Sequence, residues 1–343
     1  MTASIPKLIA RLLAGCLGLA MVATAAAQAP EKLKVRLDWT PWGVHAAFHL
    51  AQQKGWFNAA GLDVEMEDGN GSVTTVQIVG GGEQFDVGHA ALASMMIARD
   101  KGLPVKAVAV FARLSDVGLL VPQGAGIRGP QDLKGKKVAY TAGSLEAPFI
   151  DAFLAAGGLK KSDIELINVD AAGKAATYAA GRTDAAFSTI PFFLPVVSQT
   201  RPSEGIRFAD YKLNMPSFGL FAPESKLATR REAISKFASV VGAAWQYVYA
   251  GHEDEAVDAI VGQRPQAKLD KKVLRGQIDA LRGFFQLPPA AGQPLGAAVA
   301  ADWATAVKTL TDAGLLKTIK DGNDFFVPGL VRAVAPARAT ATK

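Results

Sequence analysis

The sequence of 343 residues contains a single cysteine, Cys16, and it lies in an apolar segment close to the N-terminus. Histidine is also scarce, with four residues in all. Three catalytic signatures are missing: the phosphate loop G-x-x-x-x-G-K-[ST], the metal helix H-E-x-x-H and the nucleophile elbow G-x-S-x-G. We therefore predict no catalytic residue, no cofactor and no metal site, and favour a binding protein over an enzyme.

The charge of the chain is mild and evenly spread. The formal net charge is +6, and acidic residues are interspersed among the lysines and arginines. Nucleic-acid binding would call for a clustered basic stripe, and the sequence has none. Half of the residues are hydrophobic, which is ample for one or two packed cores. After the N-terminal segment, no apolar run reaches the ~20 residues of a membrane-spanning helix.

The first 27 residues have the three parts of a secretory signal peptide. Lys7 and Arg11 supply the positive start, residues 12–27 carry no charge, and the segment ends in small residues. Cleavage after Ala27 is favoured over cleavage two residues later, which would leave Pro30 at the start of the mature chain. Cleavage after Ala27 removes the only cysteine, and with it disulfides, thiol nucleophiles and cysteine-ligated metals.

A bacterial lipoprotein signal is the alternative interpretation of the same segment. The residues Leu13-Ala14-Gly15-Cys16 resemble a lipoprotein cleavage site. Only four apolar residues separate Arg11 from Cys16, however, and the apolar run continues well past the cysteine. We therefore favour a soluble periplasmic protein over lipidation at Cys16.

Alternating β-type and helical segments predict an α/β fold in two rounds. A first round runs from residue 33 to 111, and the rhythm restarts at 136. The predicted strands are 33–37, 62–66, 85–88, 105–111, 136–140, 164–169 and 184–187, with crossing strands at 118–122 and 218–221. The predicted helices are 44–54, 73–79, 92–101, 145–156, 172–180, 230–249, 253–263, 271–285 and 297–313.

Two rounds predict two similar lobes. We assign residues 33–120 and 219–330 to a discontinuous first lobe and residues 121–218 to a second lobe. Residues 331–343 are poor in large apolar side chains and are predicted to be a disordered tail.

Two local patterns have ordinary explanations. The match Gly124-Ala125-Gly126-Ile127-Arg128-Gly129 fits G-x-G-x-x-G, but it does not join a strand directly to a helix, so it is interpreted as a cluster of turns. His45 and His49 have the spacing of two metal ligands on one helical face, yet no carboxylate or third histidine lies close by in sequence.

Three groups of residues form a recognisable combination along the chain. They are Leu37-Asp38-Trp39-Thr40-Pro41 with His45, Ala51–Phe57 and Ala60–Val64; Phe85-Asp86-Val87-Gly88-His89-Ala90; and Asp132-Leu133-Lys134-Gly135-Lys136-Lys137-Val138. Together they resemble one known family, the substrate-binding proteins of ABC importers for nitrate, sulfonates, taurine and thiamine precursors. The resemblance covers roughly residues 33–225 and is strongest in the branch that binds pyrimidine- or flavin-like rings.

The resemblance implies a two-lobed periplasmic-binding-protein fold of type II, hinged at two crossing strands. It implies a monomer that captures a small molecule and delivers it to an inner-membrane ABC permease with its ATPase. The best prediction for the solute is a planar ring of the thiamine-precursor or flavin type. Aliphatic sulfonates, taurine, nitrate and aromatic acids remain alternatives.

A relative in this family is an enzyme, the fungal pyrimidine synthase, which carries a lysine after its Asp-x-Gly strand and a run of cysteines. Here His89-Ala90-Ala91-Leu92 follows Gly88, and the next lysine is Lys101. Both differences argue against synthase chemistry.

The ligand is expected beyond the carboxyl ends of strands, where parallel α/β lobes bind their ligands. Asp38, Trp39, Trp42 and His45 follow the first strand. Indole faces suit a planar ring; Trp42 is the stronger candidate, whereas Trp39 fits the core equally well. Asp38 would accept hydrogen bonds from ring amines or cap a turn, and His45 could instead be structural.

Other strand ends supply further candidates. They are Ser72, which would also serve as a helix N-cap, Gly88 and His89 in the first lobe, and Thr141, Gly143, Ser144 and Ser188 in the second. We expect the residues around Gly143 to present free N–H groups at the start of a helix. Glu146 at the same helix start would favour the helix dipole whether or not it touches the ligand.

We predict that the mature protein begins at or near Gln28, because the small residues before it form the signal-peptidase pattern. Intact-mass analysis of exported protein tests this. A lipid-modified N-terminus at Cys16 would contradict it.

Overall fold

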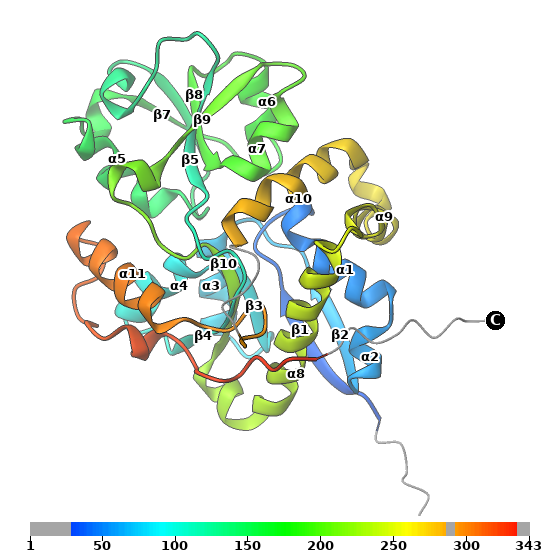
Figure 1. Cartoon of the computed structure of the whole chain (residues 1–343). Coiled ribbons are helices and arrows are strands. Elements are labelled where there is room, and N and C mark those ends of the chain that lie inside the picture. Colours follow the sequence, from blue (N-terminus) through cyan, green and yellow to red (C-terminus); the bar gives the residue numbers. More distant parts are fainter. Residues whose placement is uncertain (1–28, 286–291, 335–343) are drawn as a thin grey trace, which may run out of the picture. The chain divides into compact units, whose positions relative to one another are not determined.

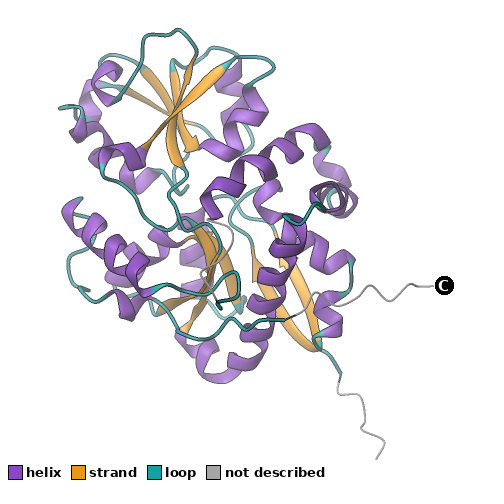
Figure 2. Ribbon diagram, in the orientation of Figure 1, coloured by secondary structure: helices purple, strands orange, loops and turns teal. Residues whose placement is uncertain are grey.

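The structure is a computed structural model, and it describes residues 29–285 and 292–334. The predicted signal peptide and residues 335–343 of the predicted tail lie outside these residues. The described chain contains two five-stranded sheets, each flanked by helices (Figures 1 and 2).

The first sheet has the strand order β2-β1-β3-β10-β4. The strand β1 pairs in parallel with β2 and β3, whereas β10 returns late in the chain and pairs antiparallel with β3 and β4. The strands are β1 (Glu31–Arg36), β2 (Leu62–Glu67), β3 (Val87–Ala91), β4 (Val105–Val110) and β10 (Phe218–Pro223), and the helices between them are α1 (Ala46–Gln53), α2 (Trp56–Ala59), α3 (Ser72–Gly81) and α4 (Leu92–Asp100).

The second sheet has the strand order β7-β6-β8-β5-β9, and its strand β5 runs antiparallel to both neighbours. We call this sheet with its helices the second lobe, and the first sheet with the remaining helices the first lobe. The elements of the second lobe are β5 (Val117–Pro122), β6 (Lys137–Tyr140), α5 (Ile150–Ala156), β7 (Glu165–Asn168), α6 (Lys174–Ala179), β8 (Ala185–Thr189), α7 (Ile190–Val197) and β9 (Ser203–Arg207).

Helices dominate the chain after β10, as the sequence predicted. They are α8 (Glu224–Val248), α9 (Glu253–Gln263), α10 (Lys271–Phe285) and α11 (Ala300–Asp312). The short 3₁₀ helices are η1 (Gly43–His45), η2 (Pro130–Leu133), η3 (Ala147–Phe149), η4 (Lys161–Asp163), η5 (Phe208–Tyr211), η6 (Pro265–Ala267) and η7 (Gly322–Phe325). None of the described helices combines the length and apolarity that crossing a bilayer requires.

Helix α10 shows how the amphipathic pattern positions a functional side chain. Its buried residues Leu274, Ile278, Leu281 and Phe285 recur every three or four positions and form one apolar stripe. Gln277 lies on the same buried side, and its Nε2 donates to the carbonyl of Phe192 in the second lobe.

The lobe boundary lies a few residues earlier than predicted. Residues 118–122 were expected to cross between the lobes, but β5 lies wholly within the second sheet, where it pairs with β8 and β9. The segments that join the two sheets are residues 111–116 and 208–217. Residues 117–120 therefore belong to the second lobe.

Two strands also end later than predicted. The prediction ended β3 at Gly88 and placed Ser188 beyond β8, but the structure continues them to Ala91 and Thr189. Every residue of both strands is buried. The alternation of buried and exposed residues that reveals a strand end is absent when both faces are covered.

The helix predicted from Leu145 begins later. Residues 147–149 form a 3₁₀ turn, and the regular helix α5 starts at Ile150. Pro148 explains the delay, because proline disfavours the helical conformation of the residue before it and lacks a backbone N–H.

Both connections between the lobes meet at one buried carboxylate. Asp116 ends the first connection, and it accepts hydrogen bonds from Ser217 of the second connection and from Thr189 at the end of β8. Burial raises the pKa of Asp116 to about 6, although these two hydrogen bonds oppose the rise. The neutral acid is therefore the form that this environment favours.

We predict that Asp116→Asn flattens the pH dependence of stability between about pH 4 and 6. An acid with a raised pKa stabilises the fold most below its unfolded pKa, and this contribution is lost as the pH rises through about 6. The difference in unfolding free energy between wild type and variant should change by up to about 3 kcal/mol over that range. Urea unfolding at several pH values measures it, and a constant difference would contradict the prediction.

Candidate functional site

A small pocket lies where the two lobes meet, at the carboxyl ends of strands from both sheets. Its cavity volume is about 10 Å³, which is room for about one water molecule. The first lobe contributes Asp38, Trp39, Trp42 and Ser72, and the second contributes Ser144, Leu145, Glu146, Lys174, Ser188, Thr189 and Phe192.

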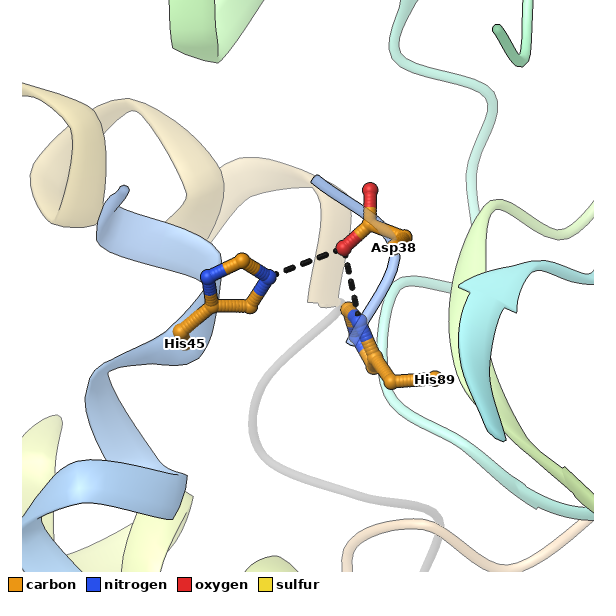
Figure 3. Close-up of side chains that lie close together, drawn as sticks. All are labelled: Asp38, His45 and His89. Atoms are coloured by element: carbon orange, nitrogen blue, oxygen red, sulfur yellow. Dashed lines mark hydrogen bonds and ion pairs between the residues drawn. The ribbon is translucent and has the colours of Figure 1, made fainter. Parts of the chain in front are cut away.

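Asp38 is the hub of a buried cluster in the first lobe. It follows β1 by two residues, and its Oδ1 lies 2.9 Å from Nε2 of His45 and 2.9 Å from Nδ1 of His89. His45 ends η1 and His89 lies within β3, so three separate elements converge on one carboxylate oxygen. Figure 3 shows the second oxygen of Asp38 directed away from both rings.

This cluster carries one negative charge. Burial raises the pKa of Asp38, but the hydrogen bonds from His45 and His89 outweigh it and lower that pKa to about 2. Burial also lowers the pKa of His89, so its ring is neutral at physiological pH. Asp38 therefore remains ionised, with one oxygen bound by the histidines and the other left for a further donor.

The same three residues could in principle hold a metal ion, because their ligand atoms lie within 4.8 Å of one another. A histidine that binds a metal usually donates its other ring N–H to an acceptor. Here Nδ1 of His45 and Nε2 of His89 are buried without a partner among the described residues. The outer nitrogens thus fit neutral rings that donate to Asp38 better than metal ligands.

His49 does not join this cluster, despite its metal-like spacing from His45. Its ring Nδ1 donates to Oε1 of Gln263, 2.9 Å away, and its backbone carbonyl accepts from Nε2 of the same glutamine. The pair at positions 45 and 49 therefore splits, with one histidine toward the pocket and the other toward α9.

An ion pair forms the opposite wall of the pocket. Lys174 Nζ lies 2.6 Å from Glu146 Oε1 and 3.0 Å from the carbonyl oxygen of Phe187, and all three groups belong to the second lobe. The ammonium also lies 5.4 Å from the ring centroid of Trp39 across the pocket. Both members of the ion pair are buried.

The pocket therefore has a net negative charge among its lining residues. Lys174 and Glu146 balance each other, and Asp38 adds one negative charge. Arg113, which follows the end of β4 by three residues, is bound by both oxygens of Asp302. It does not line the pocket.

Trp42 is part of both the core and the pocket. The sequence makes Trp42 the stronger candidate for ligand contact, yet its side chain is only 1% exposed. Its ring contacts Phe192 and Phe218 edge-on, at centroid distances of 5.3 and 5.5 Å. Replacement by alanine would therefore also destabilise the fold, typically by about 3–5 kcal/mol. Trp39, 7% exposed, likewise lines the pocket while packing in the core.

Of the eleven predicted ligand residues, six line the pocket, and two more, His45 and His89, bind Asp38 from behind. The six are Asp38, Trp39, Trp42, Ser72, Ser144 and Ser188. Ser72 is the first residue of α3 rather than its cap, and its Oγ accepts from the backbone of Ala91.

The other three predicted residues have structural contacts instead. A Cβ on Gly88 would lie 2.3 Å from the ring of Phe221, so this glycine makes room for the core. The hydroxyl of Thr141 donates to the carbonyl of Val169. The carbonyl of Gly143 accepts from the backbone N–H groups of Val73 and Thr74 at the start of α3, which joins the two lobes.

Sequence reasoning missed Lys174 and Phe192, and each left a signal. Lys174 is the one charged residue in an alanine-rich helix, at the N-terminal end where a positive charge opposes the helix dipole. Such a lysine needs another partner. Phe192 is next to Phe193, and two successive helical residues cannot both face the same core.

We predict that His89→Phe raises the pKa of Asp38 from about 2 toward its ordinary value. The variant keeps the stacked contact with Phe218 but loses the N–H donor. An ionised Asp38 stabilises the fold above its unfolded pKa, and this contribution disappears as the pH falls toward 2. The variant should lose about 1–3 kcal/mol at neutral pH and show a flatter acid limb.

Carboxyl carbon NMR and urea unfolding measure both effects. His49→Phe is the matched control, because His49 is buried but does not touch Asp38. It should leave the Asp38 titration unchanged. An unaltered titration in His89→Phe would contradict the role of His89.

Known proteins resemble this chain in sequence and fold. The formylaminopyrimidine-binding protein of Halalkalibacterium halodurans is 27% identical over 250 residues, 70% of this chain and 73% of that protein. A 4-amino-5-hydroxymethyl-2-methylpyrimidine phosphate synthase of Saccharomyces cerevisiae, THI11, is 32% identical over 134 residues, 39% of each chain.

The periplasmic aliphatic sulphonate binding protein SsuA of Escherichia coli shares the fold, with a TM-score of 0.65 and 17% identity over 89% of this chain and 95% of that one. The two-lobed α/β architecture is therefore that of periplasmic substrate-binding proteins. Residues 42–256 match the family described as NMT1/THI5 like. The chain belongs to the NMT1/THI5-like family.

Proposed function

We propose that this protein is the periplasmic solute-binding component of an ABC importer and that it captures a planar, amine-bearing heteroaromatic molecule such as an aminopyrimidine. The observation that carries the proposal is the ionised carboxylate of Asp38, which faces an aromatic pocket between two lobes with one oxygen unbound. The relative that binds formylaminopyrimidine supports the same class of ligand.

The Asp38 carboxylate selects a hydrogen-bond donor. A hydrogen bond from a ligand to this ionised carboxylate is worth about 1.5–3 kcal/mol. An exocyclic amine or a protonated ring nitrogen supplies that bond. His45 and His89 both bind Oδ1 of Asp38, so the second oxygen is left for this bond.

Lys174 selects an acceptor at the opposite edge of the ligand. An ammonium group has three N–H donors, and the described residues accept two of them, at Glu146 and at the Phe187 carbonyl. The third suits a ring nitrogen or a carbonyl oxygen. An aminopyrimidine carries a donor and an acceptor on one rigid ring, as these two walls require.

Aromatic walls complete the case for a flat ligand. Trp39 and Trp42 from the first lobe and Phe192 from the second all line the pocket. Aromatic rings packed against one another contribute about 0.5–1.5 kcal/mol beyond the burial of their area.

Small anions fit this pocket poorly. The one lysine that lines it is already paired with Glu146, and Asp38 would repel a sulfonate or nitrate in a medium of low dielectric constant. The SsuA likeness, at 17% identity, supports the fold alone.

Synthase chemistry, the second candidate, has one feature in its favour, because Lys174 places a lysine in the pocket. An ammonium held by Glu146 and the Phe187 carbonyl is not a free amine, however, and it cannot attack an aldehyde. The described residues contain no cysteine. These features support a binding protein.

We predict that 4-amino-5-hydroxymethyl-2-methylpyrimidine stabilises the protein in a thermal-shift assay, by about 2.7 kcal/mol at one hundred times its Kd. Taurine, an alkanesulfonate and nitrate should leave the melting temperature unchanged. The tightest binding by one of these anions would contradict the proposal. Mass spectrometry after incubation should recover the pyrimidine unaltered, and turnover would favour the enzyme.

Asp38→Asn tests the carboxylate directly. The variant should bind the aminopyrimidine about 10- to 150-fold more weakly, the loss of one charged hydrogen bond. The matched ligand is the same ring without its amine, whose affinity should change far less. Equal losses for both ligands would show that Asp38 does not contact the amine.

A further inference from the structure

Phe192 lies where a flat ligand would contact both tryptophans. Its ring centroid is 5.3 Å from that of Trp42 and 6.3 Å from that of Trp39, and it meets each indole edge-on. The tryptophans belong to the first lobe, whereas Phe192 is the third residue of α7 in the second lobe. One lobe therefore places a ring against the indoles of the other.

No space remains beside Phe192 for a second ring. The cavity of about 10 Å³ holds about one water, whereas a cavity that takes benzene is about 150 Å³. A ring ligand must therefore take the place of the Phe192 side chain or hold the lobes farther apart than this structure has them.

The Phe192 ring can leave without damage to the core of its lobe. It is partly exposed, whereas its neighbours Pro191 and Phe193 are buried. Phe193, with Tyr178 and Val197, belongs to the apolar cluster of the second lobe, whereas Phe192 packs on the margin of that cluster and of the main core.

The backbone of Phe192 is held in place while its side chain faces the pocket. Its carbonyl accepts from Nε2 of Gln277 at 3.0 Å, and Oε1 of the same glutamine accepts from the N–H of Gly43 at 2.9 Å. Gly43 adjoins Trp42, so one amide side chain links the backbone that carries Phe192 to the backbone beside the indole.

We propose that Phe192 is the specificity-determining residue of the pocket and acts as a displaceable substitute for the ligand ring. Without ligand it packs on Trp39 and Trp42 and keeps the lobes together. A ring ligand displaces it, and the size of side chain 192 limits the ring that can enter. This inference rests on the proposed binding of a planar ring.

Competition of this kind weakens the measured affinity. Only the fraction of molecules with the ring position free can bind, and the apparent Kd is the intrinsic Kd divided by that fraction. Removal of the phenyl ring should raise the fraction toward one. The variant should then bind more tightly, opposite to the loss expected when a residue that stacks on the ligand is removed.

Calorimetry with Phe192→Ala tests the proposal. The variant should bind 4-amino-5-hydroxymethyl-2-methylpyrimidine at least about tenfold more tightly than wild type, and it should also bind the three-ring lumichrome, which wild type should reject. Leu194→Ala is the control, because Leu194 is on the same helix outside the pocket and should leave affinity unchanged. Equal or weaker binding by Phe192→Ala would overturn the proposal.

Small-angle scattering without ligand gives an independent result. Phe192→Ala should have a larger radius of gyration than wild type, because the contact that joins the lobes is lost. An equal radius of gyration would overturn the proposal that Phe192 takes the place of the ligand ring. If neither protein binds any ring but the radius still increases, the ring-binding function fails while the contact between the lobes is supported.

Discussion

The pocket depends on keeping the carboxylate of Asp38 charged in a site that water barely reaches. Burial alone would favour the neutral acid, and the chain counters this by bringing two histidine donors to one oxygen. Each donor requires its own element, and so η1, β3 and the end of β1 must meet at a single point. The outer ring nitrogens have no partner among the described residues, so a proton placed on either one would be a buried donor without an acceptor.

In the proposed function, the two lobes supply different halves of the recognition chemistry. The first provides the accepting carboxylate and the indoles, and the second provides an ammonium already balanced by Glu146 and the ring of Phe192. Neither half binds a rigid ring on both edges by itself. Asp116 lies at the meeting point of the two connections, where a change of lobe arrangement would alter its contacts with Ser217 and Thr189.

The sequence predicted the two-lobed α/β class, most of the elements and the first-strand residues around Asp38. Alternation in β1 and the turn that follows it are local signals, and local signals survive in sequence. The ends of β3 and β8 could not be read, because strands buried on both faces lose the alternating pattern.

The contact between Asp38 and His89, which lie 51 residues apart in the sequence, could not be predicted. It depends on the pairing of β1 with β3. Lys174 was missed because its partner Glu146 lies on another element, 28 residues earlier. Glu146 was noticed only as a favourable charge at a helix start. Long-range contacts of this kind follow from the packing of elements, and no local pattern encodes them.

The hydrogen bonds that join the lobes directly are formed between neutral groups. Gln277 donates to the carbonyl of Phe192, and the Gly143 carbonyl accepts from Val73 and Thr74. Among the described residues, no ion pair links a residue of 117–207 to the first lobe. Water can replace each neutral hydrogen bond when the lobes separate. Dissolved salt weakens attraction between charges but leaves such bonds nearly unaffected, so the hydrogen bonds between these lobes are insensitive to ionic strength.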